Sequence, residues 1–221
     1  MQEKRVTLFA GHYGSGKPNI AVNYARWLAQ AGHPVTLADL DIVNPYFRAK
    51  DSEADLQEYG VRLISSPYAN SNVDLPAIPQ EMYAVVDDKS HYAVLDIGGD
   101  DRGALALGRY APGILEEGQY EMLLVINRYR PLSRDARDTL EIMHEIETAG
   151  GIRFTAIVNN SNLGAETTAE TVLDSVEYAA EVARDTGLPV KMTTVDSRLV
   201  PELTGKIPNL FGITLQKRDF F

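Results

Sequence analysis

Short apolar runs alternate along the chain with longer amphipathic stretches. Most of the apolar runs are unbroken, which is typical of strands covered on both faces of a sheet. The strand candidates are Val6–Ala10, Val35–Ala38, Val61–Ile64, Tyr92–Leu95, Met122–Ile126, Phe154–Val158 and Val190–Thr193. Because helical stretches lie between them, the sequence predicts an α/β fold with one doubly wound, mostly parallel sheet of about seven strands flanked by helices.

The helical stretches have recognisable ends. Asn19–Gln30 follows the first strand. Ser133–Thr148 begins with its serine as a suitable N-cap and is closed by two glycines, and Thr167–Thr186 is long, amphipathic and ends before a glycine. The proline-containing stretch Ser66–Pro79 is the longest irregular region, and we interpret it as a surface loop, with a lid or partner surface as the alternative. No linker or repeat interrupts the chain, so residues 1–221 are expected to form one domain.

A glycine-rich turn joins the first strand to the first helix. Its glycines and lysine fit the G-x-x-x-x-G-K part of the Walker A motif, in which backbone N–H groups curl around phosphates and the lysine reaches the β- and γ-phosphates. The helix that follows adds its positive N-terminal end. The residues expected to bind nucleotide here are Gly11, Gly14, Ser15, Gly16, Lys17, Pro18 and Asn19, with Lys17 also expected to be catalytic.

Pro18 stands where the motif has Ser or Thr. Proline has no hydroxyl to bind Mg²⁺ and no backbone N–H to bind phosphate, although it is well tolerated in the first turn of a helix. A γ-phosphate without its metal loses the main neutraliser of developing charge. We therefore expect a preserved fold with slow hydrolysis or none, unless Asn19 or a water partly compensates.

Aspartates follow two of the other predicted strands. Asp39 and Asp41 end the second strand, and Asp96 ends the fourth and is followed by glycines. Ligands of doubly wound sheets bind beyond the carboxyl ends of the strands, so these side chains are expected to meet the glycine-rich turn. We predict that Asp39 and Asp96 are magnesium ligands and that Asp41 orients an attacking water. Taken singly, Asp39 or Asp41 is as well explained as a loop or cap residue.

Composition narrows the choice of function. The net charge is −10 with a pI of about 4.9, which disfavours a nucleic-acid surface. The chain has no cysteine, which excludes disulfides, thiolate zinc sites and iron–sulfur clusters. No signal peptide, membrane-spanning run or amphipathic terminal helix is evident, so we expect a cytoplasmic protein that does not bind membranes.

Together these motifs resemble the MinD/ParA/CobQ-like P-loop proteins of the SIMIBI class. The resemblance is carried by GHYGSGK, DLDIVNPYFR, VLDIGG, LLVINR and AIVNN, in the family's order over roughly residues 5 to 160. It implies ATP or ADP with Mg²⁺, the roles given above for Asp39, Asp41 and Asp96, and an adenine contact from Asn159, with Asn160 as the neighbouring alternative. It also implies a protein partner or a homodimer.

The chain departs from the family pattern in ways that narrow its function. His12 stands nearest to the early loop lysine that many members use across a dimer, and the cysteine pairs of metal-inserting members are missing. We expect an ATP/ADP-binding nucleotide-dependent switch and possible ATPase, with a degenerate Walker A motif and switch segments Asp39–Arg48 and Asp96–Arg102. The alternatives are a non-hydrolysing nucleotide-responsive module that binds a protein, and an ATP-dependent small-molecule ligase or kinase of the dethiobiotin synthetase type.

Overall fold

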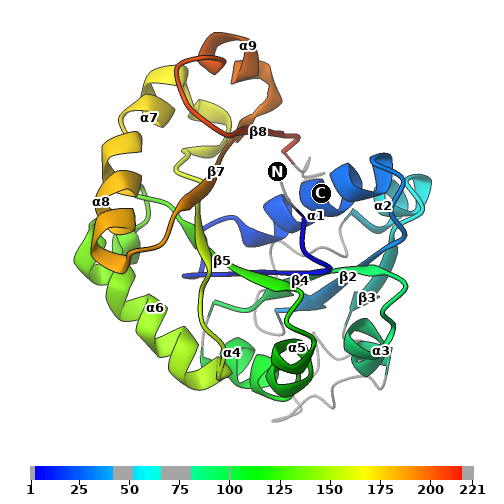
Figure 1. Cartoon of the computed structure of the whole chain (residues 1–221). Helices are drawn as coiled ribbons and strands as arrows, with labels where there is room; N and C mark the ends of the chain where they lie inside the picture. Colours follow the sequence, from blue (N-terminus) through cyan, green and yellow to red (C-terminus); the bar gives the residue numbers. More distant parts are fainter. Residues whose placement is uncertain (1–2, 42–51, 66–80, 100, 216–221) are drawn as a thin grey trace, which may run out of the picture.

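A single parallel sheet organises the molecule (Figure 1). The computed structural model describes residues 3–41, 52–65, 81–99 and 101–215, and within them eight strands form one sheet of order β3-β2-β4-β1-β5-β6-β7-β8, in which every pair is parallel. The strands are β1 Val6–Ala10, β2 Val35–Leu40, β3 Arg62–Ser65, β4 Tyr92–Ile97, β5 Tyr120–Ile126, β6 Ala156–Asn159, β7 Val190–Asp196 and β8 Leu210–Ile213. The predicted fold class is confirmed.

Helices cover both faces of the sheet (Figure 1). They are α1 Lys17–Gln30, α2 Glu53–Glu58, α3 Glu81–Asp87, α4 Asp101–Gly108, α5 Ala111–Glu117, α6 Ala136–Gly150, α7 Ala169–Leu173, α8 Val176–Thr186 and α9 Val200–Leu203. On the face that carries α1 and α2, Phe9 of β1 is fully buried, and on the face that carries α3 to α6 and α8 its neighbour Leu8 is fully buried. Since successive strand residues point to opposite faces, two covered faces require unbroken apolar strands.

The start of α6 differs from the prediction. Asp135, not Ser133, is its N-cap, and the Asp135 side chain accepts a hydrogen bond from the N–H of Asp138. Ser133 instead ends a 3₁₀ turn, and its hydroxyl donates to the carbonyl of Asn127 over 2.8 Å. A carboxylate at this position also suits the positive end of the helix, which favours Asp135 as the cap.

The stretch predicted as one helix over Thr167–Thr186 is two helices, α7 and α8. Thr168 caps α7 with a capping box, and the break falls at Ser175. The Ser175 hydroxyl is fully buried, donates to the carbonyl of Val172 over 2.7 Å and accepts from Asn159. A serine whose hydroxyl bonds to nearby backbone offers the chain an alternative to a continuous helix.

An eighth strand lies beyond those predicted. β8 pairs with β7 and places Phe211 against Trp27 of α1, with 6.1 Å between ring centroids. Asn23 of α1 holds the residue after β8, since its side chain bonds both the N–H and the carbonyl of Thr214. The predicted loop Ser66–Pro79 lies outside the described residues. Within the described ranges, no helix is long and apolar enough to cross a membrane.

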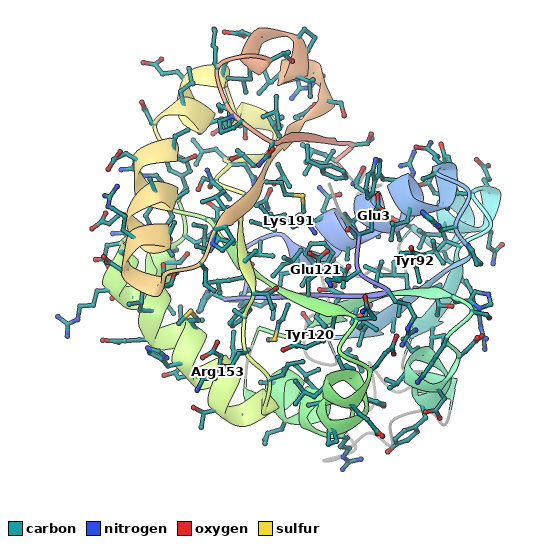
Figure 2. All side chains as sticks on the ribbon, in the orientation of Figure 1. Glu3, Tyr92, Tyr120, Glu121, Arg153 and Lys191 are labelled. Atoms are coloured by element: carbon teal, nitrogen blue, oxygen red, sulfur yellow. The ribbon has the colours of Figure 1, made fainter. Side chains whose placement is uncertain are left out.

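A buried ion pair lies near the amino-terminal ends of β5 and β7. Figure 2 labels Glu121 of β5 and Lys191 of β7, whose side chains are paired at about 10% exposure each. Glu121 also accepts hydrogen bonds from the hydroxyls of Thr7 and Tyr24, both at 3.2 Å. Burial and the Glu121 charge raise the pKa of Tyr24 above its usual range. The network joins β1, β5, β7 and α1 through one carboxylate.

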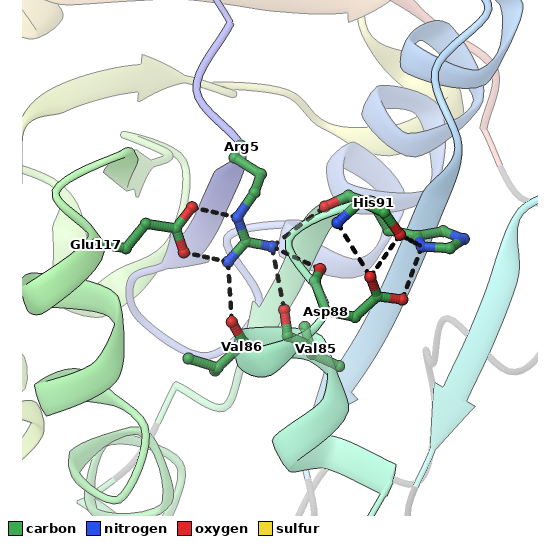
Figure 3. Close-up of polar contacts among 7 residues, drawn as sticks. Arg5, Val85, Val86, Asp88, His91 and Glu117 are labelled. Atoms are coloured by element: carbon green, nitrogen blue, oxygen red, sulfur yellow. Dashed lines mark hydrogen bonds and ion pairs between the residues drawn. The ribbon is translucent and has the colours of Figure 1, made fainter.

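A second buried pair lies at the start of β1. Arg5 forms a two-pronged ion pair with Glu117 of α5 and donates to the carbonyls of Val85, Val86, Asp88 and His91 (Figure 3). Val85 and Val86 belong to the last turn of α3, where carbonyls lack partners within the helix and carry partial negative charge. Arg5 therefore caps α3 and fixes it against α5.

Candidate functional site

The glycine-rich turn between β1 and α1 has a conformation that only glycine suits. Gly11 and Gly16 have φ angles of 148° and 91°. A Cβ on Gly11 would lie 2.4 Å from the carbonyl oxygen of Val125, and one on Gly16 would lie 2.3 Å from Nδ2 of Asn160. Both the backbone conformation and the neighbouring atoms therefore exclude side chains here. At Gly11 the loop approaches the backbone of β5, and at Gly16 it approaches the side chain of Asn160.

Lys17 is the first residue of α1, and its side chain is folded back into this loop. It is 2% exposed, and its Nζ donates to the carbonyls of Gly11 over 3.0 Å and His12 over 3.2 Å. A buried ammonium is stable only where acceptors or anions surround it. The N-terminus of α1 has no side-chain cap, because Gly16 is the N-cap residue. Its first-turn N–H groups are thus suited to an anion.

Pro18 lies in the first turn of α1, buried behind the loop. This is the position at which a proline costs a helix least, because the missing N–H has no partner within the helix. Asn19 follows and is half-buried, and its carbonyl accepts from Nδ2 of Asn23 over 2.8 Å. The substitution therefore leaves the helix intact and removes a hydroxyl from the loop.

The predicted aspartates converge beside the loop. Asp39 of β2 and Asp96 of β4 are direct partners in the register of their parallel strands, and Asp41 follows β2. Asp39 accepts a hydrogen bond from the N–H of Asp41 over 3.0 Å. All three side chains are buried, with Asp96 at 0% exposure. The pairing of β2 with β4 thus brings together carboxylates that lie more than fifty residues apart in the chain, at the carboxyl edge of the sheet where ligands of such folds bind.

Asp96 is the most perturbed group of the site. Neither of its carboxylate oxygens has a hydrogen-bond partner among the described residues. Its pKa lies well above the usual range, first because of burial and then because of the charge of Asp39, while Lys17 opposes the shift and Asp41 adds to it. A buried carboxylate next to two others is unstable as an anion unless a cation joins it.

These residues fit a divalent hard cation that is completed by a ligand. Within the described ranges no three His, Cys, Asp or Glu side chains converge closely enough to hold a metal alone. Mg²⁺ is commonly bound by one or two carboxylates, with water and substrate phosphates as its remaining ligands. Asp39 and Asp96 supply that number of carboxylates, and the oxygens of Asp96 lack other partners.

The end of β4 packs directly on the loop. A Cβ on Gly99 would lie 2.6 Å from the backbone nitrogen of Tyr13 and 2.9 Å from the carbonyl of Gly11. Gly98 packs on α4 and on Asp41, since a Cβ on Gly98 would lie 3.1 Å from the Cα of Gly103 and 3.4 Å from Oδ1 of Asp41. Gly99 therefore lets the strand end and the loop touch backbone to backbone.

The two asparagines after β6 have different surroundings. Asn159 is fully buried, donates from Nδ2 to the Ser175 hydroxyl over 2.9 Å and accepts from the N–H of Ser161 over 3.2 Å. Asn160 donates from Nδ2 to the carbonyl of Ser15 over 2.6 Å and accepts from the hydroxyl of Thr194 over 2.6 Å. The contact with the phosphate loop is made by Asn160, which sequence reasoning named only as a neighbour. The predicted adenine contact of Asn159 stays a prediction.

A pocket adjoins these residues at the carboxyl ends of β6, β7 and β8. The hollow is open to solvent on one side, and its space, open solvent included, is about 260 Å³. Its lining includes Asn160, Asn162, Thr167, Thr194, Asp196 and Ile213. The Asp196 carboxylate accepts from the backbone and guanidinium of Arg198, which lowers the pKa of Asp196. A partly open pocket with both polar and apolar lining residues thus lies next to the glycine-rich loop, and no sequence motif indicates it.

The predicted switch segments are described only in part. Asp39–Arg48 is described through Asp41, and the rest lies outside the described residues. Asp96–Arg102 is described except for residue 100 and the side chains of the two residues after it. The part that is described, Asp96 to Gly99, lies against the loop as set out above.

Comparison with known proteins agrees with this geometry at the level of the fold. No protein-family model and no curated protein matches the chain. Solved structures do match it. They include the signal recognition particle receptor FtsY of Elizabethkingia anophelis (TM-score 0.52, 17% identity, 87% of this chain and 59% of that one) and the FtsY of Thermotoga maritima (TM-score 0.57, 19% identity, 86% and 61%).

A third structure is the signal recognition particle 54 kDa protein of Aeropyrum pernix, in complex with GDP (TM-score 0.53, 16% identity, 87% of this chain and 41% of that one). The chain spans about three fifths or less of the length of these three proteins. At such low identity the likeness establishes the fold alone. This chain therefore has the fold of a P-loop NTPase.

Proposed function

We propose that residues 1–221 form one P-loop domain that binds a nucleoside di- or triphosphate with Mg²⁺ and acts as a nucleotide-dependent switch. The observation that carries the proposal is the position of Lys17. Its ammonium is folded into a glycine-rich loop, and its charge opposes the raised pKa of the buried Asp96 at the carboxyl edge of the sheet. A nucleotide phosphate and its metal would satisfy both the loop and the carboxylates.

Each predicted site residue has a role in this proposal. The backbone of Gly11, Gly14, Ser15 and Gly16 and the start of α1, with Pro18 and Asn19, surround the phosphates. Lys17 moves from loop carbonyls to phosphate oxygens when they arrive. Asp39 and Asp96 hold Mg²⁺, which supplies charge neutralisation for phosphoryl transfer. Asp41 accepts a hydrogen bond from the attacking water.

Hydrolysis is proposed to be slow or absent because of Pro18. The loop lacks the hydroxyl that helps to fix the metal, so the protein would hold Mg²⁺ through Asp39 and Asp96 alone, with phosphate oxygens and water as its other ligands. The fold does not depend on that hydroxyl, since α1 accepts the proline in its first turn. A measurement of phosphate release therefore tests whether the protein is an ATPase. A binding measurement alone tests whether it binds nucleotide.

ATP and ADP are the proposed ligands, on the resemblance to MinD/ParA/CobQ-like proteins. The pocket beside Asn160 and Thr194 is the proposed seat of the base, because it adjoins the loop. The structure of the 54 kDa protein named above contains GDP, so guanine nucleotides are the necessary comparison. On composition, we propose a cytoplasmic protein that does not bind nucleic acid or membranes, and a protein partner or a second copy as the receiver of the switch.

The test is calorimetric titration of the purified protein with ATP, ADP, GTP and GDP, each with and without Mg²⁺. We expect ATP and ADP to bind, with Mg²⁺ strengthening the binding of ATP. Lys17→Met should weaken binding at least tenfold, because it removes the buried ammonium. Lys206→Met, at an exposed lysine, is the matched control and should bind like the wild type.

The results separate the levels of the proposal. Preference for guanine nucleotides would overturn the choice of ATP and keep the switch. Binding that is indifferent to Mg²⁺ would refute the metal role of Asp39 and Asp96. No binding of any nucleotide, or equal binding by Lys17→Met, would refute the proposal as a whole.

Pro18 favours a second candidate, a module that binds a protein partner in a nucleotide-dependent way without turnover. It predicts a change of mass in light scattering, or capture of a partner, with ATP and not ADP, and no phosphate release. The ligase or kinase alternative needs a substrate pocket, for which Ser66–Pro79 is the candidate segment, and that segment lies outside the described residues. Substrate-stimulated ATP consumption would be its sign.

A further inference from the structure

One side chain connects the pocket to the phosphate loop. The Asn160 carboxamide is 2% exposed, and both of its ends are bonded inside the protein. Nδ2 donates to the carbonyl of Ser15 in the loop, and Oδ1 accepts from the hydroxyl of Thr194 on β7, each over 2.6 Å. A carboxamide is planar and rigid, so its two hydrogen bonds cannot be reoriented separately.

The bond to Ser15 bears on the backbone group that follows. The carbonyl of Ser15 and the N–H of Gly16 belong to one planar trans peptide, in which they point in opposite directions. A donor that holds the carbonyl therefore aims the N–H of Gly16 away from Asn160. Gly16 has a φ of 91° and no room for a Cβ beside Nδ2, so this peptide is held closely against Asn160.

The other end of the link lies in the pocket. Asn160 and Thr194 both line the space at the carboxyl ends of β6 to β8. The residues around them are held by local bonds, such as that from Nδ2 of Asn162 to the carbonyl of Asn160 over 2.7 Å. A group that enters the pocket would contact Asn160 and Thr194 directly. It can act on the loop by fixing the hydroxyl of Thr194 and, through it, the carboxamide.

We propose that Asn160 is a positioning residue that couples the pocket to the phosphate loop, so that a nucleoside in the pocket strengthens the binding of phosphate groups in the loop. This inference rests on the proposed function. Asn160 acts without touching the phosphates, and Thr194 is the contact through which pocket occupancy reaches it. Coupling of this kind is reciprocal, so phosphate groups strengthen nucleoside binding by the same factor.

The experiment divides the nucleotide into two probes. Adenosine and inorganic pyrophosphate are titrated into the full-length protein by calorimetry, each alone and each in the presence of a saturating amount of the other. In the wild type we expect each to tighten the other about fivefold or more. Guanosine replaces adenosine if guanine nucleotides bind better.

Matched variants show the route of the coupling. Thr194→Val keeps the shape and removes the hydroxyl, and should reduce the coupling factor to about one. Thr194→Ser keeps the hydroxyl and should retain the coupling. Thr167→Val removes a hydroxyl from the same pocket that bonds only to the backbone of residues 163 and 164, and it too should retain the coupling. Should Thr194→Val not fold, Thr194→Ala takes its place.

The outcomes distinguish this inference from the proposed function. If both probes bind the wild type independently, or if Thr194→Val keeps the coupling, the inference is overturned and nucleotide binding stands. If Thr167→Val loses the coupling as fully as Thr194→Val, the specific route through Asn160 is overturned. If neither probe nor the whole nucleotide binds, both proposals fall.

Discussion

Replacing Asp96 by Asn should stabilise the free protein at neutral pH. Asp96 is fully buried, neither of its oxygens has a hydrogen-bond partner among the described residues, and Asp39 is its direct strand partner. Asn has almost the same shape, so the change creates no cavity. It replaces a buried carboxylate that repels its neighbours by a neutral amide.

The pH dependence gives the size of the effect. The pKa of Asp96 is raised in the folded state, so folding favours its protonated form. Its contribution to stability is therefore fully present below the unfolded pKa of about 3.9 and is lost as the pH rises toward the folded pKa. Over that window the wild type loses about 1.4 kcal/mol per pH unit relative to Asp96→Asn. The two proteins should be similar near pH 4, and the variant should be the more stable at pH 7.

Urea unfolding of both proteins between pH 4 and pH 8, without nucleotide or metal, measures this difference. Asp185→Asn on the exposed end of α8 is the control, and its difference from wild type should stay within about 0.5 kcal/mol. A wild type that is more stable than Asp96→Asn at pH 7, or a difference that does not grow with pH, would refute the reasoning. It would mean that Asp96 is satisfied as an anion in the free protein.

The same variant links stability to the proposed function. With Mg²⁺ and ATP at 100 times their dissociation constant, the wild type should gain about 2.7 kcal/mol. Asp96→Asn should gain less, because it has lost a metal ligand. The substitution should therefore raise the stability of the free protein and lower the stability gained from Mg²⁺ and ATP. This combination is expected of a carboxylate whose role is to bind a cation.

Other perturbations test the loop and the sheet. Pro18→Thr should increase the effect of Mg²⁺ on ATP affinity about tenfold in calorimetry, because the threonine hydroxyl adds one charge-assisted bond. An unchanged effect would contradict the role given to that hydroxyl. Gly99→Ala puts a Cβ 2.6 Å from the nitrogen of Tyr13. It should lower the free energy of unfolding in urea by about 1–3 kcal/mol and abolish ATP binding. Normal ATP binding would show that the loop can move away. Lys191→Met leaves the buried Glu121 without its cation and should cost about 3–5 kcal/mol, whereas a loss below about 1 kcal/mol would show that the pair contributes little.

The sequence predicted those parts of the fold that local pattern determines. β1 has the predicted bounds, because its residues face two apolar layers and read as one run. β8 was missed because its four residues include a glycine and lie partly exposed at the sheet edge, so no apolar run marks them. The predicted Ser133 cap of α6 is wrong because the Ser133 hydroxyl is bonded to the carbonyl of Asn127, a tertiary contact that the local sequence does not show.

The candidate site, too, was predictable from the sequence only in part. The loop glycines, Lys17 and the strand-end aspartates could be found from spacing, and the topology rule predicted that they would meet. The role of Asn160 could not be found, because its partner Ser15 is 145 residues away and nothing in the local sequence separates it from Asn159. Which of two adjacent asparagines faces the loop is decided by strand register, since neighbouring residues point to opposite faces.

The effect of Pro18 follows from where the loop gets its shape. Gly99 packs on the nitrogen of Tyr13, and Asn160 holds the carbonyl of Ser15, so the curl of the loop is fixed by contacts from β4 and β6 rather than by residue 18. On the proposed function, a proline in the first turn of α1 takes away a metal ligand and leaves the shape of the phosphate loop unchanged. The proposal therefore predicts that nucleotide binding and hydrolysis can be separated in this chain. A single change back to threonine should for that reason restore metal dependence without any need to rebuild the loop.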